Sequence, residues 1–169
     1  LNLKAQRLNP RQPNYNRLRA ADGKRLVAAR LAGWARVGDT WVLAKRWDKA
    51  EEAYAEAAAL AGWGRADLKR KYATALAHNH KWDKAMHEAD VMIDIAKSEA
   101  EALLDGLETA RATLTTDADK ERIDQIMRRV EKRGNVQVKA RKARKAVDDD
   151  KKIEAFVAKY NKLTAAGRH

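Results

Sequence analysis

The chain has 169 residues and no Cys, which suits one domain with short extensions and excludes disulfides, thiolate metal sites and cysteine nucleophiles. No apolar run approaches the ~20 residues needed to cross a bilayer. The net charge of +12 is concentrated at the ends, because residues 1–30 hold eight Lys and Arg against one Asp, and residues 134–169 hold ten against four acidic residues. The N-terminus lacks the apolar segment of a signal peptide, and since the chain opens on Leu1 we expect a processed product or a piece of a longer chain, with the compartment unknown.

Scarce Gly and Pro, with abundant Ala, Lys, Arg, Glu and Leu, predict an all-α chain. Residues 1–20 hold both prolines and four asparagines, which predicts an extended basic arm. From about residue 21, apolar residues recur at steps of three and four, and this predicts a helix with Asp22 as its N-cap. Gly33 and Gly38 on that helix indicate close packing against a neighbour.

The same periodicity predicts further helices over about 48–60, 66–78, 84–96, 98–114 and 118–133. Their N-cap candidates are Asp48 (with Glu51 as a capping box), Asp83, and Thr116 with Asp117. Gly134 is predicted to end the last of them. These helices form one predicted domain over 21–134, followed by a basic linker over 135–149.

The final segment, residues 150–169, is predicted to be a C-terminal amphipathic helix and tail. Apolar residues at steps of three and four place its helix over about 150–164. Aspartates at 148–150 lie at the helix N-terminus, where the macrodipole favours negative charge. We expect this helix to dock onto the last helices of the domain or onto a partner.

A five-residue string repeats in this chain. Arg-Trp-Asp-Lys-Ala begins at Arg46, and Lys-Trp-Asp-Lys-Ala begins 35 positions later at Lys81. A self-match at that spacing indicates a helical repeat. Around the first copy, small and aromatic residues alternate in the order Trp34, Gly38, Trp41, Ala50, Tyr54, Ala57. This pattern resembles the tetratricopeptide repeat (TPR), well over residues 31–96 and weakly beyond.

The resemblance implies stacked helix-turn-helix hairpins, about three of them, in a solenoid-like domain. Gly38 and Ala50 are then small so that two antiparallel helices approach closely, while Trp34, Trp41 and Tyr54 fill the hollows beside them. Trp47 and Trp82 recur at one position of the repeat, and we expect them to pack against the preceding hairpin rather than to anchor a partner.

Proteins of this family bind peptides or partner helices in a groove lined by the first helices of their hairpins, so the resemblance implies such a groove here. Its candidate residues are Asp39, Val42, Asp67, Arg70, Lys71 and Thr74, with Trp63 as an aromatic residue in the following turn. A solvated helix face is the alternative for Arg70 and Lys71, and contact with the next hairpin is the alternative for Trp63. Ala35 and Asp39 stand where a carboxylate-binding subgroup has Lys and Asn, which disfavours recognition of a C-terminal carboxylate.

The basic ends carry a second hypothesis, contact with nucleic acid or another anionic surface. Its candidate residues are Arg7, Arg11, Arg17, Arg19, Lys139, Arg141, Lys142, Arg144 and Lys145. The central run would form a dense cationic band on a helix, although it has no aromatic residue for base stacking. Charge that only keeps the chain ends in solution is the alternative.

Chemistry-bearing motifs are not found. His78, His80, His87 and Asp90 lack the spacing of a structural zinc site, and there is no phosphate-binding loop, nucleophile elbow or isolated carboxylate pair. We therefore expect no enzyme, cofactor or metal. The sequence favours a non-catalytic protein–protein interaction scaffold or adaptor in a larger assembly; the alternative is a nucleic-acid- or ribonucleoprotein-associated protein that uses its basic termini.

Overall fold

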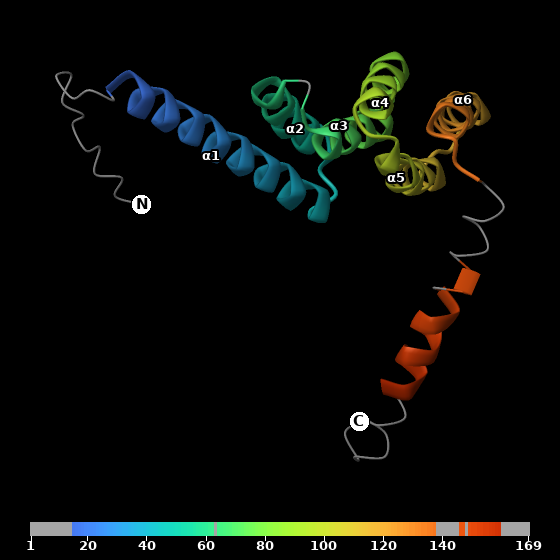
Figure 1. Cartoon of the computed structure of the whole chain (residues 1–169). Helices are drawn as coiled ribbons and strands as arrows, with labels where there is room; N and C mark the ends of the chain where they lie inside the picture. The colour runs from blue at the N-terminus through green and yellow to red at the C-terminus, as the bar shows by residue number, and fades with distance from the viewer. Residues whose placement is uncertain (1–14, 63, 138–145, 148, 160–169) are drawn as a thin grey trace.

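The computed structural model describes residues 15–62, 64–137, 146–147 and 149–159, and for residues 15–19 it describes the backbone alone. All regular structure in these ranges is helical, which confirms the all-α prediction (Figure 1). The elements are α1 (Tyr15–Leu43), α2 (Trp47–Ala61), α3 (Ala66–His78), α4 (Trp82–Ile95), the 3-10 turn η1 (Lys97–Glu99), α5 (Ala100–Ala112) and α6 (Asp117–Gly134). Residues 146–147 and 149–159 are also helical. No helix in the described ranges is long and apolar enough to span a membrane.

The first helix begins earlier in the sequence than predicted. Instead of starting near residue 21, α1 begins at Tyr15 and continues for 29 residues. Its first turns lie in the segment predicted to be extended. After Pro13 the sequence contains no residue that breaks a helix until Gly23, and Arg and Ala favour one. Asp22 therefore lies inside the helix and is not its N-cap.

The aspartates of the repeated string do not cap their helices. Helices α2 and α4 begin one residue earlier, at their tryptophans, and Arg46 and Lys81 occupy the N-cap positions without side-chain caps. Asp48 lies in the first turn of α2, where its carboxylate pairs with Arg46 Nη2 at 3.0 Å. A carboxylate in the first turn is favoured by the helix dipole.

The ends of α6 confirm one capping prediction and correct another. Thr116 caps the helix, because its hydroxyl accepts a hydrogen bond of 3.1 Å from the Asp119 backbone N–H. Gly134 is the last helical residue, and Asn135 takes the left-handed conformation, with φ of 54°, that ends the helix. Gly134 is needed for a different reason, since a Cβ there would lie 2.6 Å from the Ala100 Cβ.

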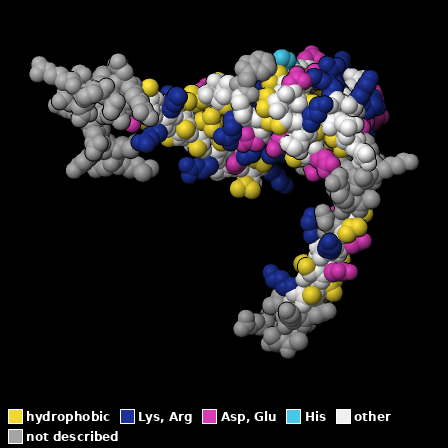
Figure 2. Space-filling model, viewed as in Figure 1, with side chains coloured by type: hydrophobic (Ala, Val, Ile, Leu, Met, Phe, Trp, Pro, Cys, Tyr) yellow, Lys and Arg dark blue, Asp and Glu magenta, His cyan; other side chains and the backbone are white. Residues whose placement is uncertain are grey.

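Helix α1 packs along α2, α3 along α4, and α5 against α6, while contacts of α2 with α3, α3 with α5 and α4 with α6 join these pairs. The main core lies among α3 to α6 and contains the large, fully buried residues Leu76, Met92, Leu103, Leu104, Leu107, Ile123, Ile126 and Val130. Smaller clusters attach α1 and α2 to it. One consists of Leu31, Ala57 and Leu68, and the other of Ala50, Tyr54 and Ala75. Acidic and basic side chains alternate over the bundle surface (Figure 2).

Helix α1 presents its tryptophans differently from the prediction. Gly38 faces the Tyr54 ring, so that a Cβ there would lie 2.6 Å from Cδ1, and Tyr54 is only 2 % exposed. Trp34 and Trp41, however, are each 36 % exposed and do not fill the space beside Gly38, which Tyr54 occupies. The N-terminal half of α1 extends beyond α2, and residues 20–30 are all exposed (Figure 1).

Candidate partner-binding groove

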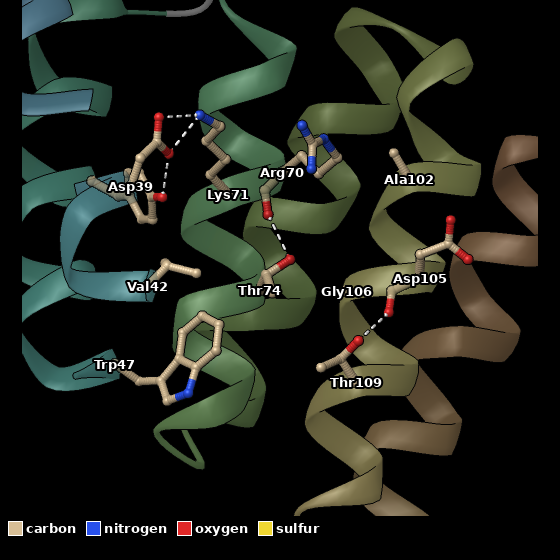
Figure 3. Close-up of a pocket in the computed structure, with 11 residues that line it drawn as sticks. Asp39, Val42, Trp47, Arg70, Lys71, Thr74, Ala102, Asp105, Gly106 and Thr109 are labelled. Atoms are coloured by element: carbon tan, nitrogen blue, oxygen red, sulfur yellow. Dashed lines mark hydrogen bonds and ion pairs between the residues drawn. The ribbon is translucent and has the colours of Figure 1, made fainter. Parts of the chain in front are cut away.

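Side chains from α1, α2, α3 and α5 surround a half-open groove with a volume of about 340 Å³ (Figure 3). The lining residues are Asp39, Val42, Trp47, Tyr54, Arg70, Lys71, Thr74, Ala102, Asp105, Gly106 and Thr109. Five residues predicted from the sequence are among them, namely Asp39, Val42, Arg70, Lys71 and Thr74. Three helices that do not follow one another in the chain, α1, α3 and α5, thus contribute side chains to one concave surface.

Asp39 of α1 is the polar centre of the groove. Its carboxylate accepts hydrogen bonds from Lys71 Nζ, at 2.6 and 2.9 Å, and from the Tyr54 hydroxyl, at 2.7 Å. Burial acts to raise the pKa of the Asp39 carboxyl, but the hydrogen bonds from Lys71 and Tyr54 outweigh it and the pKa is lowered. Burial, and next the bond to Asp39, raise the pKa of Tyr54. Asp39 is therefore ionised, Tyr54 keeps its proton, and α1 is linked to both α2 and α3.

The other cation of the groove is also neutralised. Arg70 Nε donates to Glu99 Oε2 at 2.8 Å, which links α3 to the turn before α5. The hydroxyls of Thr74 and Thr109 donate to backbone oxygens of Arg70 and Asp105 in their own helices. Each hydroxyl oxygen thus presents its lone pairs as a hydrogen-bond acceptor. The groove combines satisfied charges with free acceptors, and it concentrates no net positive charge.

Gly106 sets the spacing of the α3 and α5 walls. A Cβ at this position would lie 2.6 Å from Thr74 Oγ1 and 2.9 Å from Thr74 Cγ2. Only glycine allows the two helices to approach this closely without movement of the Thr74 side chain or of the helices. Val42 and Trp47 lie on the other side of Thr74 from Gly106 (Figure 3).

Trp47 is held by a residue of the following helix pair. Its indole stacks on the His78 imidazole at the end of α3, with ring centroids 3.5 Å apart and planes 6° apart. The prediction that Trp47 packs against a preceding unit is therefore wrong. Burial, and then the charge of His80, lower the pKa of His78 to about 4, and its buried Nε2 has no hydrogen-bond partner among the described residues.

The turn after α3 reinforces that contact. Asn79 Nδ2 donates to the Trp47 carbonyl at 3.0 Å and to Glu51 Oε2 at 2.7 Å. Lys81 Nζ donates to Glu51 Oε1 at 2.7 Å. Glu51 therefore does not close a capping box on α2. It binds the next turn instead, and these bonds hold the first turn of α2, which carries Trp47 at the end of the groove.

The remaining predicted site residues lie elsewhere. Asp67 does not line the groove, because its carboxylate forms two hydrogen bonds with Arg65, at 2.8 and 2.7 Å. Trp63 lies outside the described residues, as do Arg7, Arg11, Lys139, Arg141, Lys142, Arg144 and Lys145. Arg17 and Arg19 belong to α1, where the description of residues 15–19 stops at the backbone. The structure does not bring any of these anion-binding candidates together within the described ranges.

Six lining residues were missed by the sequence analysis: Trp47, Tyr54, Ala102, Asp105, Gly106 and Thr109. The α5 residues lie where the repeat signature has faded, so no register connected them to the groove. Gly106 was the one available signal, since a glycine within a helical pattern indicates a close approach. For Trp47 and Tyr54 the sequence predicts packing within the fold and no contact with the groove.

Asp39 and Tyr54 share a hydrogen bond at the centre of the groove. Asp39 is ionised by its own partners, and its neighbours are a cation and a phenol held protonated. Within the same ranges no three His, Asp or Glu converge as metal ligands, and Asp90 pairs with Arg129 and Arg133. Comparisons of the chain with protein-family models, with curated proteins and with solved structures found no match.

Proposed function

We propose that this protein is a non-catalytic interaction scaffold of TPR-like stacked hairpins, and that its groove binds a short segment of a partner protein. One observation carries the proposal: side chains of α1, α3 and α5 line a single concave surface whose charged groups are already paired. Paired groups lose little freedom on binding, so the groove is preorganised. The volume of about 340 Å³ is within the lower range of ligand pockets and suits one or two side chains of a peptide.

The lining indicates which segment would fit. Val42, Trp47 and Ala102 offer apolar contact, and an apolar or aromatic anchor would complete it. The hydroxyl oxygens of Thr74 and Thr109 lie on facing helices and would accept hydrogen bonds from the peptide backbone. Because Arg70 and Lys71 are already paired, a strongly acidic segment would have to displace Glu99 and Asp39. The groove therefore favours a segment that is apolar and close to neutral.

Selection of phage-displayed random linear peptides on the intact chain tests this function. Val42→Glu places a carboxylate in the groove, and Thr109→Arg adds bulk at an exposed groove position; Val157→Glu is the matched control on the helix at 149–159. Selected peptides should bind the wild-type chain and the control equally and bind both groove variants at least about tenfold more weakly. Circular dichroism checks that each variant is folded. Peptides that bind all four chains equally, or a selection that enriches none, would reject the groove as the site.

The charge pattern supports a second candidate, a nucleic-acid-associated protein that uses its basic termini. With a net charge of +12 and its basic residues near both ends, the chain could release counterions from a phosphate backbone. The affinity for a DNA or RNA oligonucleotide should then fall steeply with salt, and deletion of residues 135–147 should reduce that slope. Absence of oligonucleotide binding at low salt would eliminate this candidate and leave the groove unaffected.

A further inference from the structure

Helix α1 carries an apolar stripe that nothing in the described part of the chain covers. Residues three and four apart share one face of a helix, and Leu26, Arg30, Trp34, Val37 and Trp41 follow this spacing. Leu26 is 57 % exposed, Val37 is 41 % exposed, and Trp34 and Trp41 are also exposed. Hydrophobic side chains are visible at the surface along α1 (Figure 2). Contiguous exposed apolar residues of this kind mark interaction surfaces.

Gly33 lies on the same face, four residues before Val37 and seven after Leu26. A glycine within a helix costs about 1 kcal/mol relative to alanine, and structures retain one where a close approach requires it. Gly38 has such a reason in Tyr54, but no atom lies within 4 Å of a Cβ built on Gly33. No contact described within the chain accounts for Gly33, whereas the close approach of another helix on this face would.

We infer that the stripe pairs antiparallel with the same stripe of a second copy of this chain, around a twofold axis between Gly33 and Trp34. The stripe is self-complementary about that point. Leu26 then faces Trp41 of the second copy, Arg30 faces Val37, and Gly33 faces Trp34, with each pair repeated by symmetry. Large side chains thus meet small ones at the crossing point, and the Arg30 guanidinium lies near tryptophan rings that favour a cation. A twofold pair is the commonest closed arrangement of identical chains.

The charges flanking the stripe fit the same register. It brings Asp22 level with Lys45 of the second copy, in the turn that follows α1, once on each side of the axis. Among the residues whose side chains are described, Asp22 makes only a loose, exposed contact of 3.9 Å with Arg25, and Lys45 forms no ion pair. Lys45 follows the end of α1 in a left-handed conformation with φ of 56°. Two symmetric pairs of opposite charge select the antiparallel register over its alternatives.

Helix α6, at the opposite end of the bundle, has a polar outer face where α1 has an apolar one. Helix α6 directs charged and polar residues outward, among them Glu121, Arg122, Gln125, Arg128 and Lys132, and buries Ile123, Ile126 and Val130. A helical array whose outer face is polar needs no further cover, whereas one with an apolar outer face does. The asymmetry places the expected contact on α1, and Asp39 faces away from it toward the groove.

Sedimentation velocity of the full chain over a range of concentrations tests the pair. We expect a monomer–dimer equilibrium, which Val37→Asp should weaken at least about tenfold while Val157→Asp leaves it unchanged. Asp22→Lys and Lys45→Asp should each weaken it about three- to tenfold, and the double exchange should restore it. The natural chain has no Cys, so under mild oxidation Gly33→Cys should form a disulfide-linked dimer and Ala32→Cys, an exposed position on another face of α1, should not.

Other occupants of the stripe give distinct results in the same experiments. If deletion of residues 146–169 abolishes dimerisation, the C-terminal helix covers α1 and the inference is wrong. If the chain stays monomeric at every concentration but binds anionic phosphatidylglycerol vesicles through Val37, the stripe is a membrane contact and the inference is again wrong. A dimer that is indifferent to both charge exchanges would overturn the register.

Discussion

The Trp47 indole lies flat on the His78 imidazole, and the two rings belong to consecutive helices, Trp47 at the start of α2 and His78 at the end of α3. The second copy of the repeated string does not reproduce this contact. Its Trp82 meets His80 edge-on, with ring centroids 5.3 Å apart, and packs against the main core. The repeat therefore conserves the position of a tryptophan at the start of a helix, while the surroundings give each tryptophan its own contact.

Acidification should destabilise the fold through His78. Its folded-state pKa of about 4 lies below the ordinary 6.5, so the unfolded chain binds a proton first as the pH falls. The contribution of neutral His78 to the unfolding free energy is fully present above pH 6.5, declines between pH 6.5 and about 4, and changes no further below that range. Because the ring is only partly buried, we expect a loss on the order of 1 kcal/mol. Urea unfolding across this window, compared with His78→Phe, isolates the contribution, and parallel pH profiles of the two proteins would refute it.

Gly38 should not tolerate a methyl group. Gly38→Ala places a Cβ against the Tyr54 ring and should destabilise the fold by about 1–3 kcal/mol in thermal or urea unfolding. The control is Gly23→Ala, where no atom lies within 4 Å and a gain of about 0.5–1 kcal/mol is expected. At the 35-residue repeat spacing, Gly38 and Tyr54 correspond to Ala73 and Ala89, so the double variant Gly38→Ala/Tyr54→Ala has the residue pair of the second repeat. We therefore expect its loss of unfolding free energy to be smaller than the sum of the two single losses. Full additivity would show that the two sites are independent.

The bridge from Asp39 to Lys71 should respond to salt and acid. Asp39→Asn leaves Lys71 unpaired on a half-exposed surface, and we expect a loss of at most about 1 kcal/mol at low salt that shrinks as salt is added. The pKa of Asp39 is lowered on folding, so the wild-type contribution is full above the ordinary value of 3.8 and is lost as the pH falls through the folded value. Lys49→Met, at the exposed pair with Glu52, is the control. An Asp39→Asn effect that does not depend on salt would argue against an ionic role.

The cap of α6 offers the simplest substitution. Thr116→Ala removes the acceptor for the Asp119 N–H and should cost about 1 kcal/mol of unfolding free energy. Thr115→Ala removes a neighbouring exposed hydroxyl that caps nothing, and it should leave stability within about 0.5 kcal/mol. Equal effects of the two substitutions would mean that the bond contributes nothing measurable.

Periodicity in the sequence located α2 to α6 within a few residues, because each of these helices buries an apolar face against neighbours. It failed at the start of α1, where every described residue up to Arg30 is exposed and no burial pattern marks the helix. It failed for Asp48 and Asp83, since a carboxylate in the first turn has the same sequence signature as a carboxylate at the N-cap.

The groove was predictable only in part. Asp39, Arg70, Lys71 and Thr74 share a register with the repeated string, and that register located them. The α5 wall carries no copy of the string, so its place opposite Thr74 depends on how far α5 can approach α3. That distance is decided by Gly106 together with the packing of the whole core, and local sequence does not encode it.

The two walls of the groove are fastened by different means. Thr74 and Gly106 are in direct contact, so α3 and α5 can separate only if backbone atoms move. The α1 wall is tied to α3 near the groove by a lysine side chain, which can rotate. We therefore expect the groove to widen by movement of the α1 wall alone, while the α3 and α5 walls keep their spacing. A ligand that hydrogen-bonds Thr109 would then meet the same α3–α5 geometry in the wide and the narrow forms of the groove.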